Sequence, residues 1–422
     1  MYGTGKDMIQ MSLHTDAEII IKDSIKAVLP DEAVKKVLMS EKIKFGDGKL
    51  ILVAIGKAAW QMANAAAVVL GNKLDAGVVV TKYQHVKGKI PKVTCFEAGH
   101  PVPDENSFLG TRAAIELVKN LTAKDTVLFL ISGGGSALFE EPLISGQELA
   151  AVTRQLLACG ADIVEMNTIR KRLSAVKGGR FAKLCEPARV YSIVLSDILG
   201  DPLDMIASGP AYPDSSTSKQ AIEIAEKCHL ELSEKVWELL ESETPKEVSN
   251  VETFIMGSVR NLCHAAQESC KSLGYKPFIL TDQLSCEAKE AGNFLAAIAK
   301  TYQNTKESIA FIAGGETVVH LTGKGKGGRN QELALAAAEG IAGLNNTAIF
   351  SIGSDGTDGP TDAAGGYVDQ ETFDKLTGNN ISVYQVLQEN DAYHALEQCD
   401  GLIKTGATGT NVNDVSVLLI KR

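Results

Sequence analysis

The stretch TVLFLISGGGSAL, residues 126–138, sets the fold pattern of this 422-residue chain. Its apolar first part, Thr126–Ile131, has the length and composition of a buried strand. A turn of glycine and serine follows, and Ala137-Leu138 then open a helical stretch. The same order of apolar run, glycine turn and helix recurs at Leu50–Ile55, which Gly56-Lys57 follow. This order is typical of βαβ units around a mostly parallel sheet.

Other short apolar runs predict the remaining strands, and helical stretches separate most of them. These runs are 77–80, 93–97, 191–195, 253–256, 276–280, 308–313, 318–321, 347–352 and 415–420. The run at 318–321 follows its predecessor too closely for a crossover helix, so we expect it to pair antiparallel. The predicted fold class is α/β, with mostly parallel or mixed sheets.

The length suits two or three domains at about 150 residues each. The polar stretch ESETPKEVSN, residues 241–250, has a proline and no hydrophobic periodicity, as is typical of a domain boundary. We therefore predict an N-terminal α/β domain over 1–245 and a C-terminal α/β domain over 246–422. The sequence leaves open on which domain the helices within 1–40 pack. The first of them presents an apolar face at Ala17, Ile20, Ile21, Ser24, Ile25 and Val28.

The composition is that of an ordinary globular protein, with 45% hydrophobic and 22% charged residues. The 42 Lys and Arg against 52 Asp and Glu give a net charge of −10, which argues against nucleic acid as the main partner. No secretory leader and no membrane-spanning run is evident, so a cytoplasmic protein is predicted. Eight scattered cysteines without a C-x-x-C pair predict free thiols rather than disulfides.

Six loops rich in Gly, Asp and Ser follow predicted strands. They are Gly56-Lys57 and residues 98–107, 132–137, 196–204, 314–317 and 353–362. Ligands of open α/β sheets bind beyond the carboxyl ends of the strands. Because the loops come from both halves of the chain, we expect the active site in a cleft between the two domains.

Two of these loops have the chemistry of an anion site. The glycines of SGGGSA, residues 132–137, let backbone N–H groups approach a phosphate, and the serines add donors. Lys57 begins a helix, where a positive charge is favourable only opposite an anion. The loop is neither a Walker A sequence nor the G-x-S-x-G elbow of hydrolases.

The segment GKGKGGRN, residues 323–330, supports two interpretations. It satisfies G-x-G-x-x-G, the fingerprint of dinucleotide enzymes, and would then mark an NAD(P)-dependent oxidoreductase. Its cations Lys324, Lys326 and Arg329 suit a polyphosphate or a carboxylate at least as well. The basic segment at 167–180 is either a second anion site or a basic face that balances the acidic remainder.

Aspartates in two of the loops are candidate ligands for Mg²⁺, which takes one or two protein carboxylates and keeps several waters. We predict Asp197 and Asp355, near the ends of their strands, and expect the neighbouring aspartates to cap turns. His100 lacks a partner at metal-ligand spacing, so we predict a substrate contact or a structural hydrogen bond for it.

Taken in order, these motifs resemble those of the glycerate 2-kinases of the MOFRL type. The matching stretches include IGKAAWQM at 55–62, SGGGSAL at 132–138, NTIRKRLSAVKGGR at 167–180, GGETVVHLTGKGKGGRNQELALA at 314–336 and GSDGTDGPTDAAGG at 353–366. The resemblance covers nearly the whole chain. It implies ATP-dependent phosphorylation of D-glycerate to 2-phosphoglycerate with Mg²⁺ or another divalent cation, in a protein of two α/β domains.

The resemblance also implies roles for individual residues. Lys57 and Arg329 fall on the family's activity-linked lysine and arginine. The nucleotide phosphates would contact the glycine loop, Ser132, Gly133, Gly134, Gly135 and Ser136. We expect Asp197 or Asp355 to hold the metal or orient the attacking hydroxyl. Glu316 is a second candidate base, and together with Asn330 and His100 it completes the predicted binding set.

Three function classes follow from these residues: a glycerate 2-kinase, an NAD(P)-dependent hydroxypyruvate reductase, and a sugar-acid-binding protein without activity. Of the three classes, the kinase suits these residues best, because phosphoryl transfer needs positioning and neutralised charge rather than covalent chemistry from the protein. The sequence leaves open transfer to O2 or O3 and a monomer or a homodimer. For a kinase of this kind we expect a place in lower glycolysis or an Entner–Doudoroff route.

Overall fold

The computed structural model describes residues 5–196 and 198–422, without the side chains of residues 5–12. The described chain divides into two compact units. The first unit comprises residues 30–196 and 201–256, and the second comprises residues 5–29, 198–200 and 257–422. The division after residue 256 differs from the boundary predicted near 245, because strand β6 (Val251–Gly257) still joins the sheet of the first unit.

The first unit is built on a six-stranded sheet in the order β3-β2-β1-β4-β5-β6. Its other strands are β1 (Leu50–Ile55), β2 (Ala76–Lys82), β3 (Val93–Ala98), β4 (Thr126–Ile131) and β5 (Arg189–Leu195). Neighbours from β3 through β5 pair in parallel, as predicted. The strand order reverses between β1 and β4, and the carboxyl ends of these two strands mark the crevice where ligands of such sheets bind.

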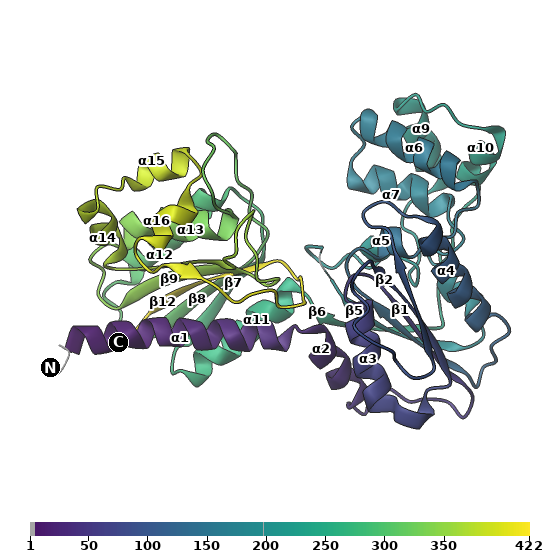
Figure 1. The fold of residues 1–422 in the computed structure, drawn as a ribbon, viewed down its shortest axis with the longest axis horizontal. Helices are drawn as coiled ribbons and strands as arrows, with labels where there is room; N and C mark the ends of the chain where they lie inside the picture. The colour runs from purple at the N-terminus through teal and green to yellow at the C-terminus, as the bar shows by residue number, and fades with distance from the viewer. Residues whose placement is uncertain (1–4, 197) are drawn as a thin grey trace. The chain divides into compact units, whose positions relative to one another are not determined.

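Helices cover both faces of this sheet (Figure 1). The helices α2 (Pro30–Leu38) and α3 (Ala59–Leu70) share a core with one face of β1 and β4. The helix α4 (Glu105–Val118) packs on β2 and β3 from the opposite face of the sheet, where Gly110 lies against Val80 and Phe96. Four further helices form a cluster with a core of their own. They are α6 (Gly146–Ala158), α7 (Ile163–Arg172), α9 (Ser218–Lys227) and α10 (Glu234–Glu241).

The second unit has a mixed six-stranded sheet in the order β11-β10-β9-β12-β8-β7. The strands are β7 (Lys276–Leu284), β8 (Ile309–Gly315), β9 (Thr347–Gly353), β10 (Gly365–Asp369), β11 (Leu402–Ile403) and β12 (Asp414–Ile420). Strand β12 runs antiparallel to both of its neighbours, β8 and β9. Its first residue, Asp414, therefore lies in register with Gly315 and Gly353 at their carboxyl ends.

Two layers of helices cover this second sheet (Figure 1). The helices α1 (Gly5–Ala27) and α11 (Val259–Ser272) lie on one face, and the predicted apolar face of α1 is buried in their shared core. The other face carries α12 (Ala288–Tyr302), α13 (Arg329–Ile341), α14 (Thr372–Gly378), α15 (Val383–Gln388) and α16 (Ala392–Glu397). The two N-terminal helices thus belong to different units, since α1 packs in the second and α2 in the first.

One predicted strand is wrong, and strand β10 was not predicted. Residues 318–321 form no strand but an exposed loop, in which Leu321 is 83% exposed and Val318 makes a single bridge to Glu287. An apolar run in a loop looks like a short strand because the pattern alone cannot show what covers it. Strand β10 begins with two glycines, a residue that is rare in strands, so its sequence does not predict a strand.

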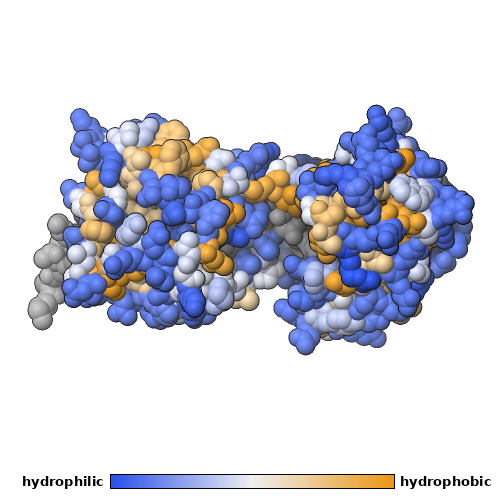
Figure 2. Space-filling view, turned by 90° about the horizontal axis from the view of Figure 1, so that it is seen from above, coloured by the Kyte–Doolittle hydropathy of each residue, from blue (hydrophilic) through white to orange (hydrophobic). Residues whose placement is uncertain are grey.

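The cysteines are not all free thiols, contrary to prediction. Cys159 and Cys228 form a disulfide that joins the ends of α6 and α9, and the other six are free. Cys159 and Cys228 are 69 residues apart in sequence, so only the packing of α6 and α9 brings the two thiols together. On the face shown in Figure 2, hydrophilic residues predominate and apolar residues gather in smaller patches. No helix in the described chain is long and apolar enough to cross a membrane.

Candidate functional site

The first group of predicted residues meets where β1 and β4 end. The N–H of Lys57 donates to the carbonyl oxygen of Gly133 at 2.9 Å. Gly134 has a φ of +82°, and a Cβ placed on it would lie 3.0 Å from Nε2 of His100 and 3.2 Å from Cε of Lys57. Only glycine combines this left-handed backbone with such close neighbours. We call Lys57, Lys82, His100 and residues 133–136 the glycine-loop site.

The glycine-loop site carries the positive charge of two lysines. Neither Lys57 nor Lys82 forms an ion pair within the described residues, and both side chains are exposed. Burial lowers the pKa of His100, and the charges of Lys57, Lys82 and His85 lower it further. His100 is therefore a neutral imidazole at neutral pH. Clustered cations without an ion-pair partner among residues 5–196 and 198–422 favour an anionic ligand.

Sequence reasoning missed two members of this neighbourhood, Lys82 and His85. Lys82 is the last residue of β2, whose carboxyl end adjoins that of β1 in the parallel sheet. Nδ1 of His85 lies 2.8 Å from the carbonyl oxygen of Lys57. A basic residue at the end of a predicted neighbouring strand was the available signal.

The serines of the loop hold it in place rather than face outward. Ser132 Oγ accepts the N–H of Ala58 and donates to the carbonyl of Ile55, both at 3.1 Å. Ser136 Oγ lies 2.7 Å from Oγ of Ser208. In contrast, the N–H groups of Gly133 and Gly134 have no hydrogen-bond partner in the described chain. The backbone, more than the serines, supplies free donors for an anion.

The basic segment at 167–180 is neither an anion site nor an exposed basic face. Lys171 is buried and donates to Asp214 at 3.0 Å, and Lys177 is buried and pairs with Glu140 at 2.5 Å. Arg172 is fully buried as well. The carboxylates that neutralise these cations, Asp214 and Glu140, lie well away in sequence. The sequence of the segment alone therefore shows positive charges without their partners.

A second group of predicted residues meets in the second unit, around Arg329 at the start of α13. Nε and one terminal nitrogen of Arg329 donate to the two carboxylate oxygens of Asp414, at 2.6 and 3.1 Å. The other terminal nitrogen donates to Glu316 at 2.8 Å. These bonds use three of the five N–H groups of the guanidinium and leave two for a ligand. We call Glu316, Arg329, Asp355 and Asp414 the arginine site.

Asp414 was missed by sequence reasoning, yet it fixes the orientation of Arg329. It lies at the amino end of β12 and is 5% exposed. Burial raises its pKa to about 6, against the opposing effect of Arg329. The carboxylates of Asp414 and Glu316 in turn raise the pKa of Arg329, which outweighs the lowering effect of its burial and keeps it charged.

Asp358 caps α13 and makes the dinucleotide fingerprint untenable. Its carboxylate accepts the N–H groups of Asn330 and Gln331, at 3.2 and 2.9 Å, so these groups are not free for a pyrophosphate. No strand directly precedes the glycines, because residues 316–328 form a long loop. The side chain of Asn330 is buried and bonded to Asp358 and Ser351. The expected capping role of the neighbouring aspartates is confirmed for Asp358.

Of the two predicted metal ligands, Asp197 and Asp355, the structure describes Asp355. Asp197 lies outside the described residues. Asp355 follows β9 and lines, with Glu316 and Arg329, a cavity of about 830 Å³. Its Oδ1 accepts the N–H of Thr357 at 2.9 Å. No group of three or more His, Cys, Asp or Glu that could hold a metal occurs among the described residues, but one carboxylate suits Mg²⁺ that is bound mainly through phosphates.

These features define an α/β protein whose two sheets carry charged loops at their strand ends, the class that includes many enzymes for small anionic ligands. Comparison with known proteins narrows the class. A family described as a domain of unknown function, DUF4147, matches residues 16–241, and the MOFRL family matches residues 309–414. The chain belongs to the glycerate 2-kinases of the MOFRL family, as its motifs predicted.

Relatives of known name match the chain over nearly its full length. The D-glycerate 2-kinase of Thermotoga maritima is 53% identical, over 95% of this chain and 97% of its own. The glycerate 2-kinase of Pyrococcus horikoshii is 39% identical, over 98% of both chains. The crystal structure of a glycerate kinase from Thermotoga maritima has a TM-score of 0.92 at 52% identity and covers 97% of this chain and 100% of that one. The α/β fold of this chain is thus shared with a solved kinase.

Proposed function

We propose that this protein transfers the γ-phosphoryl group of ATP to O2 of D-glycerate, giving 2-phosphoglycerate and ADP. The observation that carries the proposal is the positive charge of Lys57 and Lys82 near the N–H groups of Gly133 and Gly134, none of which has a partner in the part of the chain that the structure describes. That combination suits a polyphosphate. The names of the relatives, glycerate 2-kinases, support the same acceptor.

In this proposal the two sites divide the work of one reaction. The glycine-loop site binds ATP phosphates through Lys57 and the loop backbone. The arginine site presents the two remaining N–H groups of Arg329 to the glycerate carboxylate or to the transferring phosphoryl group. Ser132 and Asn330, which bond within the protein, hold these elements in place rather than contact substrate.

The chemical step forms the bond from glycerate O2 to the γ-phosphorus and breaks the bond to the β,γ-bridging oxygen, which leaves with ADP. The proton of the attacking hydroxyl needs an acceptor, and we assign Asp197 or Glu316. Glu316 keeps a carboxylate oxygen free beside Arg329. A neutral His100 can bond to a phosphate or hydroxyl without adding charge. Charge neutralisation and alignment supply most of the catalysis.

A divalent cation fits this assignment. Asp355, and in the sequence pattern Asp197, would hold it. When bound, such a cation neutralises charge on the β- and γ-phosphates.

The decisive experiment incubates the purified chain with ATP, Mg²⁺ and D-glycerate, and then adds enolase without a mutase. Enolase accepts 2-phosphoglycerate directly, so formation of phosphoenolpyruvate establishes both the kinase activity and the O2 position. ADP without phosphoenolpyruvate would contradict transfer to O2. Oxidation of NADH or NADPH by hydroxypyruvate, with no ADP formed from glycerate, would replace the proposal by the reductase. Chelation of the cation should abolish the reaction, and added Mg²⁺ should restore it.

A further inference from the structure

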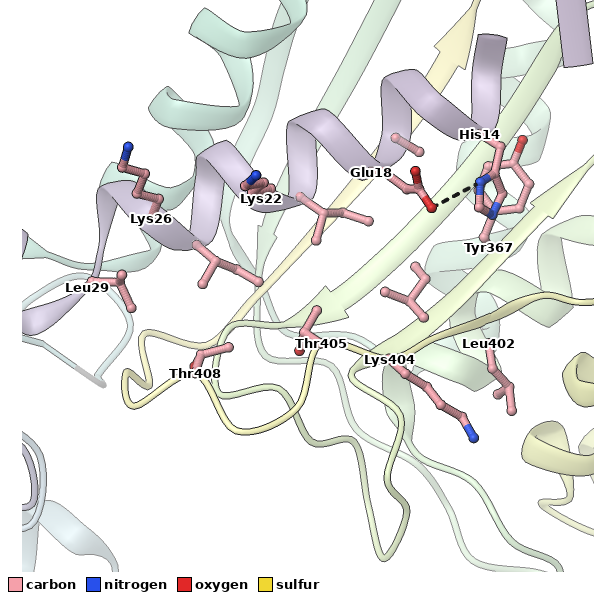
Figure 3. Close-up of a pocket in the computed structure, with 14 residues that line it drawn as sticks. His14, Glu18, Lys22, Lys26, Leu29, Tyr367, Leu402, Lys404, Thr405 and Thr408 are labelled. Carbon is pink, nitrogen blue, oxygen red and sulfur yellow. Dashed lines mark ion pairs between the residues drawn. The ribbon is translucent and has the colours of Figure 1, made fainter. Parts of the chain in front are cut away.

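The lining of an elongated groove in the second unit includes no residue of the glycine-loop site or the arginine site. The groove runs along α1 from His14 to Leu29, opposite the segment 402–408, and encloses about 690 Å³ (Figure 3). At about 1.5 Å per residue, the helical part of this path is about 20 Å long. The volume is that of a site for a small organic molecule.

The groove is lined by apolar groups along its length. Ala17, Ile21 and Ile25 form the side given by α1, and Leu402 and Ile403 lie across from them. The ring of Tyr367 closes one end beside His14, with ring centroids 4.9 Å apart. A long groove with apolar groups along it suits an unbranched aliphatic chain better than a compact polar molecule.

Two cations lie on the rim without partners. Lys22 and Lys26 are one helical turn apart on α1, and neither forms an ion pair within the described residues. Other lysines nearby are neutralised, since Lys404 pairs with Asp362 at 2.9 Å and Lys421 with Asp16 at 2.6 Å. In a chain of net charge −10, such a pair attracts an anionic head group.

Hydrogen bonds connect the groove to the arginine site within the same unit. Thr410 Oγ1 donates to the carbonyl of Val28, directly after α1, at 2.8 Å. Thr408, which lines the groove, donates through Oγ1 to the carbonyl of Ser354 at 2.6 Å and through its N–H to that of Asp355 at 3.2 Å. A molecule that moves this segment would also move Asp355.

We propose that the groove binds an amphipathic anion, an unbranched aliphatic chain with one anionic head group, and that its occupancy alters catalysis through Asp355. The head group lies at Lys22 and Lys26, away from Glu18, and the tail lies along Ile21 and Leu402. The effect on catalysis rests on the proposed kinase activity, whereas the binding does not. By linkage, any effect of the anion on ATP binding is matched by an equal effect of ATP on the anion.

Calorimetry with decanoate tests the binding, with decyltrimethylammonium as a probe of equal tail and opposite charge. We expect decanoate to bind and the cation to bind at least tenfold more weakly. The double variant Lys22→Gln/Lys26→Gln should weaken decanoate binding about tenfold. Lys300→Gln, an exposed lysine on α12 over the other face of the sheet, is the matched control and should leave binding unchanged. Thr405→Trp, at the exposed rim, should block the groove.

Several outcomes would overturn the proposal. Absence of decanoate binding, equal binding of both probes, or equal loss in Lys300→Gln would each exclude an anion site here. A change of oligomeric state in Thr405→Trp, without decanoate binding to the parent chain, would make the groove a contact between copies instead. For the coupling, decanoate should change the KM for MgATP at least twofold in the parent chain and not in Thr405→Trp. Decanoate binding with an unchanged KM for MgATP would overturn the proposed effect on catalysis. If the chain has no kinase activity, calorimetry alone tests whether the groove binds decanoate.

Discussion

The glycine-loop site contains two lysines at strand ends and the arginine site contains one arginine at a helix start, and the two sites treat this positive charge in opposite ways. Neither Lys57 nor Lys82 pairs with a carboxylate of the described chain, and the N–H groups of Gly133 and Gly134 have no partner there either. Arg329 is held by two carboxylates, one of them buried. The first arrangement has a positive potential that suits a ligand with several negative charges. The second has one guanidinium against the carboxylates of Glu316, Asp355 and Asp414, so its cation is outnumbered but is held in a fixed direction.

The difference indicates two ways of recognising an anion. Exposed lysines suit ATP, a ligand with several negative charges. A guanidinium fixed by Asp414 suits a small carboxylate or a phosphoryl group in transfer, where geometry decides. Variants at the two sites should therefore fail differently, and the predictions below test this.

Arg329→Ala should have the largest effect. It removes the two ligand-facing N–H groups and leaves Asp414 buried without its partner. We expect kcat/KM for glycerate to fall about 10³-fold, the scale on which an arginine stabilises phosphoryl transfer. Arg329→Lys should recover little, because an ammonium cannot replace the fork that Asp414 and Glu316 hold. Steady-state kinetics would measure this, with Arg154→Ala, an exposed arginine on α6, as control.

Lys57→Ala should have the next largest effect, about 100-fold in kcat/KM for ATP, from the loss of a charge-assisted contact to phosphate. The KM for ATP should change more than the KM for glycerate. Lys73→Ala replaces an exposed lysine of the same unit and should change neither. A larger change in the KM for glycerate would contradict our division of roles between the two sites.

Asp414 makes the arginine site dependent on pH, unlike the glycine-loop site. Its folded pKa of about 6 is raised by burial above the ordinary value of an aspartate. The folded state therefore holds this proton more tightly than the unfolded state. The ionised carboxyl lowers stability above pH 6, and this cost disappears as the pH falls from about 6 to about 4. Activity should change in the opposite direction, because protonation removes the negative partner of Arg329.

Asp414→Asn tests this pH dependence. Its kcat/KM should be lower than that of the parent by about tenfold at pH 7.5, on the scale of a lost charge-assisted hydrogen bond. The decline below pH 6 should vanish, and urea unfolding should show no stability change between pH 4 and pH 6 from this residue. A persistent acid limb in the pH profile of Asp414→Asn would assign the titration to another group.

Gly134→Ala should have the smallest effect. An added Cβ would strain the left-handed backbone by about 1–2 kcal/mol and would approach His100 and Lys57. We expect a loss of that size in the free energy of unfolding and a few-fold increase in the KM for ATP. Gly160→Ala at the end of α6 is a matched control, since its φ is +76° but no atom lies within 4 Å of the added Cβ. The same strain without the kinetic effect is expected there.

Much of the fold could be predicted from the sequence because its strands are short and apolar. The run at 126–131 was predicted to its exact bounds, and Leu50–Ile55 likewise. These strands are buried on both faces, so their composition alone marks them. The exposed run at 318–321 has a similar composition and is not a strand, since composition does not report burial.

The sequence by itself determined the family, the α/β class and the loops that carry Lys57, Gly134 and Arg329, because these depend on local patterns and on motifs in a fixed order. Tertiary structure alone decided which charges are neutralised. It placed Asp414 against Arg329, 85 residues away, and buried Lys171 and Lys177 against distant carboxylates. It gave Lys57 and Lys82 no ion-pair partner within the described ranges. The energy of an ion pair depends on the distance between the two charges in space. Because parallel and mixed sheets bring together segments that are far apart in the sequence, the two members of such a pair cannot be read from a local pattern.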